Sequence, residues 1–244
     1  PDLLGLIDQY GADATRFGIM IASPAGNDLL FDESSLEQGR NFNNKLWNAL
    51  KLVKMWEGRQ AMNNEQLITN NFALIWFDNR LNEVKTEVNG LMEQFRLSEA
   101  LKTIYSLIWD DFCSWYLEWV KPGFEQPIEK AVYEKTIFFF TELMQLLHPY
   151  MPFVTEEIYH LLQERTDDLC MKQFSSVRDF DMAILQNGTT LKKDITAIRD
   201  VRVKNGIKNS EQIKFMCSGS VDLFFRRNSD ILFLLEKQTN LKYF

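Results

Sequence analysis

Cysteine, histidine, proline and glycine are all scarce in this chain of 244 residues. The three cysteines, Cys113, Cys170 and Cys217, lie far apart and show neither a CxxC pair nor a ligand spacing with histidine. They indicate reduced thiols in a cytoplasmic protein and no zinc-binding motif. Eleven glycines and six prolines are too few for a linker-rich or disordered chain, so a compact fold is expected.

The sequence also lacks any membrane or secretion signal. No stretch of about 18 apolar residues is without charges, and the first residues, PDLLGLIDQY, lack the basic and apolar regions of a signal peptide. The net charge of −7 argues against a protein that coats nucleic acid indiscriminately, because sequence-independent affinity comes from Lys and Arg that neutralise phosphates. We expect no membrane partner and no DNA partner, and any RNA contact must be local.

The chain does contain enough apolar material for a sizeable core, with 45% hydrophobic and 13% aromatic residues. Its length predicts one main domain with a smaller appendage. The charge is unevenly distributed: residues 191–244 hold 11 Lys and Arg against 6 Asp and Glu, which leaves 16 against 28 in residues 1–190. This asymmetry separates an acidic main body from a basic tail domain.

Up to about residue 165 the apolar residues recur at helical spacing. A start signal at Asp32 and Ser34, with Glu37 in capping-box register, begins the first long helix. Antiparallel helices joined by short loops make a bundle, and the first 22 residues form a helical lead-in. The predicted helices of the bundle span residues 33–57, 71–93, 97–120, 128–147 and 153–165.

The pattern changes after residue 168, where short strand-like pieces alternate with helical ones. The expected fold is mainly α: an antiparallel helical bundle over residues 1–168, followed by a small α+β domain, expected to be incomplete, over residues 169–244. The predicted strands of this second domain are 169–174, 212–217 and 241–244, and its predicted helices are 189–203 and 221–236.

No catalytic constellation is present in the sequence. It contains no glycine-rich dinucleotide or phosphate loop, no HExxH and no GxSxG. The two histidines, His148 and His160, share no local motif and are interpreted as capping or surface residues. The carboxylates beside aromatic residues, Asp110, Asp111 and Glu118, lack a partner carboxylate for acid–base work and are interpreted as exposed or paired. We expect no catalytic and no metal-binding residue.

A polar stripe on the first long helix is the most informative feature. Asparagine is not a preferred residue inside helices, because its amide competes with backbone hydrogen bonds. An amide offers a donor and an acceptor together, which suits the edge of an unpaired base, while Lys and Arg suit phosphates. Spacing alone favours a plain solvated face. The stripe comprises Arg40, Asn41, Asn44, Lys45, Asn48 and Lys51, roughly opposite the apolar Phe42, Leu46, Ala49 and Val53.

Several strings of the sequence resemble the valyl-tRNA synthetases, which are class I enzymes. The string GADATRFGIMIASPAGNDLLFDESSLEQGRNFNNKLWNALKLV is similar to the segment after the KMSKS loop of that family. DDFCSWYLEWVKP and LHPYMPFVTEEIYHLL resemble its helical bundle, and ITAIRDVRVKNGI resembles the junction that follows. The match covers nearly the whole chain in the family's order. The isoleucyl and leucyl enzymes share the bundle strings in looser form, whereas NFNNKLWNA is typical of the valine member.

The resemblance implies a parent enzyme that attaches valine to its tRNA, with ATP and Mg as cofactors and an editing domain that rejects threonine. The HIGH and KMSKS motifs that bind ATP in that family are absent here, as are the editing and Rossmann segments. We therefore expect a C-terminal, anticodon-binding fragment that starts just after KMSKS and stops before the coiled-coil arm of many members. The fragment is expected to be inactive on its own, without a cofactor, monomeric and cytoplasmic.

By the same resemblance, the polar stripe belongs to the bundle that receives the anticodon stem-loop of the tRNA for valine. Valine anticodons share A in the middle and C in the third place, and these bases have open Watson–Crick edges in a single-stranded loop. Arg40 and Phe42 are lesser candidates, for phosphate contact and for stacking, and Phe42 is expected in the core. Arg199, Arg202 and Lys204 in the basic junction are candidates for the tRNA backbone, against a solvated face. The alternative function is a helical protein-interaction module without RNA contact.

Overall fold

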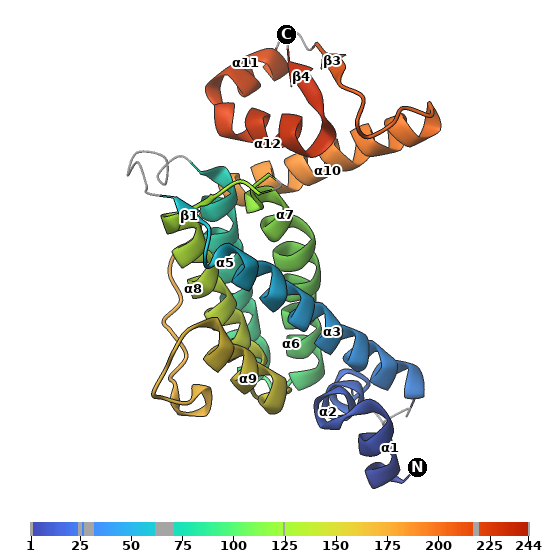
Figure 1. The fold of residues 1–244 in the computed structure, drawn as a ribbon. Helices are drawn as coiled ribbons and strands as arrows, with labels where there is room; N and C mark the ends of the chain where they lie inside the picture. Colours follow the sequence, from blue (N-terminus) through green and yellow to red (C-terminus); the bar gives the residue numbers. More distant parts are fainter. Residues whose placement is uncertain are drawn as a thin grey trace. The chain divides into compact units, whose positions relative to one another are not determined.

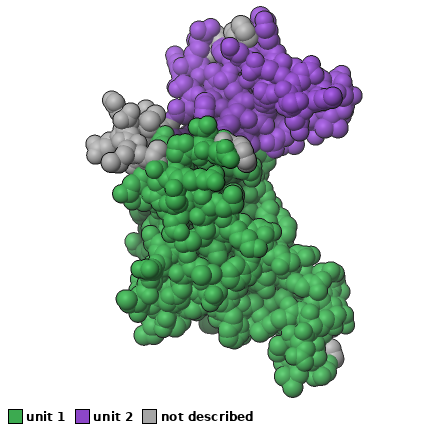
Figure 2. Space-filling model, in the orientation of Figure 1, with its two compact units in different colours: residues 1–63, 80–179 green, residues 64–79, 180–244 purple. Residues whose placement is uncertain are grey.

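The computed structural model describes residues 2–23, 26, 32–61, 71–123, 125–216 and 220–243, apart from the side chains of residues 61 and 220–222. The chain divides into two compact units (Figure 2): residues 1–63 with 80–179, and residues 64–79 with 180–244. Helices make up most of the described chain (Figure 1), which confirms the mainly α prediction.

Two short helices open the first unit. Helix α1 (Leu3–Tyr10) begins at Asp2, whose side chain accepts a hydrogen bond from the backbone N–H of Leu4 (3.2 Å). Gly11, with a φ of 90°, turns the chain into α2 (Ala12–Ile21). Only glycine adopts such a backbone conformation at little cost. The lead-in is therefore helical, as predicted.

The long helix α3 (Glu33–Trp56) agrees with the predicted helix 33–57. Its N-cap is Asp32, which accepts a hydrogen bond from the backbone N–H of Ser34 (2.9 Å). Ser34 itself lies inside the helix, so the predicted capping box with Glu37 does not form. One face of α3 is buried, through Leu36, Gly39, Phe42, Leu46, Ala49, Leu50, Val53 and Trp56.

Helices α2 and α3 cross so closely that two glycines face backbone atoms across the contact. A Cβ atom at Gly18 would lie 2.8 Å from the backbone nitrogen of Leu36. A Cβ atom at Gly39 would lie 2.7 Å from the carbonyl oxygen of Ala14. Neither position has room for a side chain, so these two glycines fix how the N-terminal half of α3 packs on α2.

The middle of the bundle contains a helical run over residues 97–120, as predicted, but its winding is not uniform. Its central part, η1, is a π-helix, in which hydrogen bonds join residues five apart. The hydroxyl of Ser114 correspondingly donates to the carbonyl oxygen of Trp109 (2.9 Å). The elements here are α5 (Phe72–Glu93), α6 (Leu97–Ser106), η1 (Leu107–Tyr116) and α7 (Leu117–Val120).

Helices α8 (Lys130–Leu147) and α9 (Pro152–Leu162) complete the bundle. A short parallel pair joins β1 (Gln60–Ala61) to β2 (Ile128–Glu129), so α8 starts two residues after the predicted position. The core between these helices is strongly aromatic and includes the buried Phe112, Tyr116, Phe139 and Phe140.

The predicted strand 169–174 does not form. Leu169–Met171 makes a 3₁₀ turn, η2, and no regular structure follows before residue 182. A strand needs a neighbouring strand for its backbone groups. Here the backbone N–H groups of Leu169 and Cys170 donate instead to the carboxylate of Glu156 (2.6 and 3.3 Å). Gln145 also donates through Nε2 to the carbonyl oxygen of Gln173 (2.6 Å), so the segment packs along the bundle.

The second unit contains the small α+β fold that the sequence predicts. Strands β3 (Ile213–Phe215) and β4 (Leu241–Tyr243) pair in parallel. The predicted helix 189–203 begins earlier, at residue 182, because Asp181 caps it by accepting from the backbone N–H of Ala183 (2.7 Å). The predicted helix 221–236 is interrupted at Asn228. The helices are α10 (Met182–Lys204), α11 (Ser220–Arg227) and α12 (Ser229–Thr239).

The division between the two units differs from the predicted boundary after residue 168. Residues up to 179 group with the bundle, whereas residues 64–79 group with the second unit. Within that unit, the indole of Trp76 covers Gly188 of α10 so closely that a Cβ atom there would lie 2.2 Å from the ring. This contact joins positions far apart in the chain, so local sequence patterns do not reveal it.

Candidate nucleic-acid interface

The polar stripe of α3 lies on the exposed side of the helix. Arg40, Asn41, Asn44, Asn48 and Lys51 are all exposed, while Lys45 is half-buried. The residues between them, such as Phe42 and Leu46, are fully buried. The helical period thus separates the two faces as the sequence predicts. We call the six residues Arg40, Asn41, Asn44, Lys45, Asn48 and Lys51 the α3 stripe.

The asparagine side chains of the α3 stripe are available to a ligand. Within the ranges that the structure describes, the amides of Asn41, Asn44 and Asn48 form no hydrogen bond with another residue. Each amide therefore keeps both its donor and its acceptor capacity. Phe42, by contrast, packs against the rings of Phe17 and Tyr105, with centroids 5.5 and 4.8 Å away. It belongs to the core and offers no surface for stacking.

The cations of the α3 stripe already have contacts within the bundle. The ammonium group of Lys45 lies over the ring of Trp109, 5.1 Å from its centroid. Arg40 pairs with Glu37 (3.2 Å) and lies over the ring of Tyr10 at 5.6 Å. The exposed contacts of Arg40 hold its side chain only weakly, so it remains free to turn towards a phosphate, whereas Lys45 is half-buried against Trp109.

Cys113 is a buried cysteine whose thiol is influenced by Lys45 of the α3 stripe. Burial raises the pKa of this thiol to about 12, although the nearby Lys45 acts in the opposite direction. The thiol therefore stays protonated near neutral pH, which makes Cys113 a core residue without nucleophilic character. Cys170, in contrast, is exposed.

A cavity of about 470 Å³ lies beside the N-terminal half of the stripe. Within it, the side-chain oxygen Oδ1 of Asn43 is buried and has no hydrogen-bond partner among the described residues. The sequence stripe did not include Asn43, because this residue lies between the polar and apolar faces. The lining comes from residues 11–13, from Arg40, Asn43, Asn44 and Trp47 of α3, and from Phe153, Val154 and Glu157 of α9.

Two residues of the GADATRF string fasten α2 to α9 next to this cavity. The carboxylate of Asp13 accepts hydrogen bonds from the backbone N–H groups of Val154 (2.6 Å) and Phe153 (3.3 Å) and so caps α9. Burial raises the pKa of Asp13, although these two N–H groups act in the opposite direction. Arg16 donates to the carbonyl oxygens of Tyr150 and Pro149, both at 3.0 Å. The signature strings GADATRF and HPYMPFVTEE thus meet in one interhelical contact.

The three basic candidates of α10 differ in how accessible they are. Arg199 and Lys204 are exposed, and Arg199 donates to the side-chain and carbonyl oxygens of Gln238 (3.0 and 3.2 Å). Arg202 is only 1% exposed, and its Nη2 donates to the carbonyl oxygens of Lys208 and Glu211. We expected Arg202 on the surface as a phosphate contact. The structure instead gives its guanidinium a role inside the second unit.

The carboxylates beside the aromatic run were expected to be exposed or paired with Lys121, which holds for the exposed Asp110 and for Glu118 but not for Asp111. Asp111 is buried and accepts from Nε of Arg80 (2.8 Å). Glu118 lies 3.6 Å from the ammonium group of Lys121.

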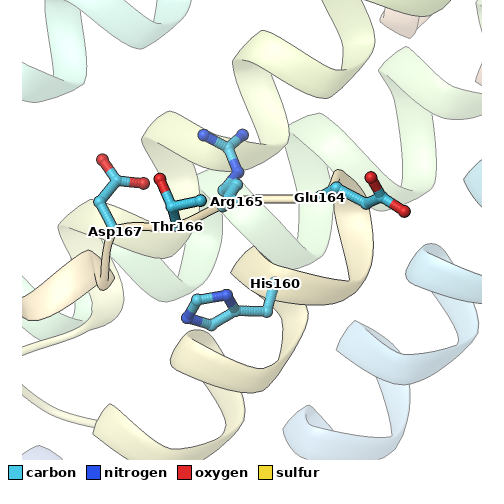
Figure 3. Close-up of a pocket in the computed structure, with 5 residues that line it drawn as sticks. All are labelled: His160, Glu164, Arg165, Thr166 and Asp167. Atoms are coloured by element: carbon cyan, nitrogen blue, oxygen red, sulfur yellow. The ribbon is translucent and has the colours of Figure 1, made fainter.

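Both histidines lie near Glu156 of α9. Nδ1 of His148 shares a hydrogen bond with Oγ1 of Thr155 (2.8 Å). His160, Glu156 and Asp168 form a group whose donor atoms lie within 4.8 Å of one another, and this group could hold a metal ion. An open hollow of about 830 Å³ adjoins His160 (Figure 3). In that view the imidazole faces the segment with Thr166 and Asp167, whereas Glu164 points away.

In the described part of the chain, no helix combines the length and the apolar character needed to cross a membrane.

The arrangement of helices is that of a tRNA synthetase bundle. The solved ternary complex of LeuRS with tRNA and LeuAMS, from Agrobacterium radiobacter, has a similar fold, with a TM-score of 0.52 and 14% identity. The likeness covers 76% of this chain and 21% of that chain. Residues 75–217 match the family described as the anticodon-binding domain of tRNA ligase. That match spans more than half of the chain, and the chain belongs to this family.

Curated relatives are named as valine–tRNA ligases. The chain is 46% identical over 229 residues to the enzyme of Porphyromonas gingivalis, which covers 92% of this chain and 26% of that protein. It is 44% identical to the enzyme of Parabacteroides distasonis, over 90% of this chain and 25% of the relative. For Clostridium tetani the identity is 35%, over 88% and 25%. The chain thus spans about a quarter of the length of these relatives.

Proposed function

We propose that this chain binds the tRNA for valine and recognises its anticodon, as a part of a valine–tRNA ligase. The family match and the names of the relatives support the class of partner. The structural observation that carries the proposal is the α3 stripe. It presents three amides without partners among the described residues, flanked by cations, on one exposed helix face.

The chemistry of the amide fits the two bases that valine anticodons share. On its Watson–Crick edge, adenine has one amino donor beside one ring-nitrogen acceptor, and cytosine has the same pair of groups. An asparagine amide complements this pair with its oxygen and its NH₂ group. Asn44 and Asn48 lie four residues apart, or about 6 Å along the helix, so each amide is placed for one of two neighbouring bases.

The cations would position the RNA backbone around these amides. From Arg40 to Lys51 the stripe is about 16 Å long, which is enough for Arg40, Lys45 and Lys51 to meet successive phosphates of a short loop. Phosphate contacts fix register and carry no sequence information, whereas the amide contacts read the bases. Arg199 and Lys204 of the second unit are proposed as further backbone contacts.

We propose that catalysis belongs to parts of the relatives that this chain does not match. The chain spans about a quarter of their length and contains neither a HIGH nor a KMSKS motif. ATP with Mg, and the transfer of valine, would then be functions of the whole ligase. The chain by itself would bind tRNA as a cytoplasmic monomer without a cofactor.

The proposal is tested by titrating single Ala variants of Asn44, Lys45 and Asn48 with two tRNAs at one fixed salt concentration. One is the valine tRNA, and the other carries a middle anticodon base other than A. A variant that has lost a base contact should bind the valine tRNA about 1–3 kcal/mol more weakly and should no longer distinguish the two.

Asn89→Ala serves as the matched control, because Asn89 is also an exposed helical asparagine but lies on α5, away from the stripe. This variant should bind both tRNAs like the original chain. If an Ala variant lost the same affinity for both tRNAs, the stripe would contact phosphates and would not read bases. If the original chain binds neither tRNA at low salt, the alternative of a helical protein-interaction module is favoured.

A further inference from the structure

Three metal-ligating side chains meet at the C-terminal half of α9. Glu156 and His160 lie one helical turn apart, and Asp168 comes from the segment that returns after the helix. One donor atom from each residue lies within 4.8 Å of the other two. The donor set is one imidazole nitrogen and two carboxylate oxygens, which are ligands that zinc accepts in proteins.

Two of the three donor–donor distances in this group agree with tetrahedral geometry, and the third, between the oxygens of Glu156 and Asp168, is within 4.8 Å. Nε2 of His160 is 3.3 Å from Oε1 of Glu156 and 3.3 Å from Oδ1 of Asp168. A tetrahedral zinc ion with ligands at about 2.0–2.1 Å holds neighbouring ligand atoms about 3.3–3.4 Å apart. An octahedral ion such as Mg²⁺ would need a spacing of about 2.9 Å. The two edges at His160 therefore fit a zinc-like ion, and one ion binds all three groups when the oxygens of Glu156 and Asp168 are also about 3.3–3.4 Å apart.

A metal ion can bind all three groups at once, whereas a proton on His160 can only form hydrogen bonds to the two carboxylates. A protonated imidazole carries one N–H bond at Nε2, and when two oxygens share this bond the alignment with each is poorer than in a single hydrogen bond. Among the described residues, the ion-pair partners of Glu156 and Asp168 are histidines and include no Lys or Arg. The carboxylates of Glu156 and Asp168 are therefore not neutralised by a direct ion pair with Lys or Arg, which leaves their charge to attract a divalent ion.

The ligands are held in place by the backbone. The carboxylate of Glu156 accepts from the N–H groups of Leu169 (2.6 Å) and Cys170 (3.3 Å), the two residues that follow Asp168. Partners of this kind orient metal ligands and add to the affinity of the site. Nearby, Asp167 is engaged by Lys172 (2.6 Å), so it does not compete for the ion.

We propose that Glu156, His160 and Asp168 form a binding site for one divalent transition-metal ion of the zinc class. The open hollow adjoins His160, one of the three ligands (Figure 3), so solvent reaches this side of the site and a water molecule would be the fourth ligand. A bound ion joins the segment after α9 to the helix, which stabilises the C-terminal edge of the bundle. This site is independent of tRNA binding through the α3 stripe.

The test is calorimetric titration of the metal-stripped chain with ZnCl₂, together with visible absorption after loading with Co²⁺. We expect one equivalent of zinc to bind, and a cobalt spectrum typical of tetrahedral coordination without a thiolate charge-transfer band. His160→Gln and Asp168→Asn should each weaken zinc binding at least about tenfold, the lower end of what even an outer partner costs. Far-UV circular dichroism checks that both variants fold, as the exposure of these side chains leads us to expect.

Two matched controls separate this site from adventitious binding. His148→Gln removes the other imidazole near Glu156, which lies 3.8 Å from Oε2, and Cys170→Ser removes the exposed thiol. Both variants should bind zinc like the original chain. The proposal is overturned if the original chain shows no saturable binding at micromolar zinc, if His160→Gln and Asp168→Asn bind unchanged, or if Cys170→Ser abolishes binding.

Discussion

At the scale of single residues, burial decides which polar side chains can meet a partner. Asn44 and Asn48 are exposed and have no hydrogen-bond partner among the described residues, so an RNA base could satisfy them. Arg202 is a long cation in a basic segment, yet it is buried and bonded to two carbonyl oxygens. Residue type suggested the same role for all three basic residues of α10, but accessibility separates Arg202 from Arg199 and Lys204.

This difference leads to a prediction for three alanine variants of α10. Arg199→Ala and Lys204→Ala should each weaken binding to all tRNAs alike and lower the salt dependence of log K by roughly one unit. Arg202→Ala should instead lower the free energy of unfolding by about 2–3 kcal/mol, because the carbonyl groups of Lys208 and Glu211 lose their donor. Titrations at several salt concentrations and urea unfolding measure the two effects.

The structural role of Arg202 would be contradicted if Arg202→Ala kept the stability of the original chain and changed the salt dependence of tRNA binding. Unchanged slopes for Arg199→Ala and Lys204→Ala would identify these two residues as a solvated face.

At the scale of elements, α3 does two things at once. Its buried face packs on α2 through a crossing that leaves no room for a Cβ atom at Gly18 or Gly39. Its exposed face carries the α3 stripe at the spacing of a straight helix. The close crossing therefore sets the position and rotation of the helix, and with it the direction in which the amides point.

Replacing these glycines should be costly, whereas a glycine elsewhere should not. Gly18→Ala and Gly39→Ala place a methyl group against backbone atoms at 2.8 and 2.7 Å and should each destabilise the fold by about 1–3 kcal/mol. Gly90→Ala in α5 meets no atom within 4 Å and should stabilise the helix by about 0.5–1 kcal/mol. Denaturant unfolding of the three variants measures the change.

If Gly39→Ala were as stable as the original chain, α2 and α3 would have to separate without cost, and the rigid placement of the stripe would be wrong. If Gly90→Ala also lost stability, glycine-to-alanine changes would be costly even without a close contact. The cost at Gly18 and Gly39 could then not be assigned to the crossing of α2 and α3.

At the scale of the whole molecule, charge is unevenly distributed along the chain. Residues 191–244 are basic, with 11 Lys and Arg against 6 Asp and Glu, while the rest of the chain is acidic. Tight and indiscriminate RNA binding is therefore not expected of the bundle. Selective contacts along α3, supplemented by phosphate contacts from α10, fit this charge distribution.

The chain alone should not activate valine. It spans about a quarter of its ligase relatives and holds no HIGH or KMSKS motif, and the carboxylates and cysteine of the bundle core are paired or buried. Valine-dependent exchange of pyrophosphate into ATP should therefore stay at background in a preparation without host synthetase. The tRNA titrations on the same preparation show that the protein is folded. Exchange clearly above background would refute the assignment of catalysis to other parts of the ligase.

Most helices of the bundle, the two faces of α3 and the family could be predicted from the sequence alone, whereas the helices of the second unit were predicted with different bounds. Helical periodicity depends on neighbours three and four residues apart, so α3, α5 and the run 97–120 could be predicted almost to the residue. The same local pattern placed the amides of the α3 stripe on one side. Glu156 and His160 are also separated by one helical turn, but the helical periodicity of the sequence does not predict that Asp168 lies beside them.

Only the tertiary structure decided the features that join distant segments. The strand expected at 169–174 is absent, and backbone groups of this segment bond instead to Glu156 and Gln145. Arg202 is buried, and carbonyl groups beyond the end of its helix accept hydrogen bonds from its guanidinium. The cavity beside Asn43 and the group around His160 likewise need side chains from separate segments. Periodicity reports which face of a helix is apolar, whereas hydrogen-bond partners and cavities depend on what the fold places opposite that face.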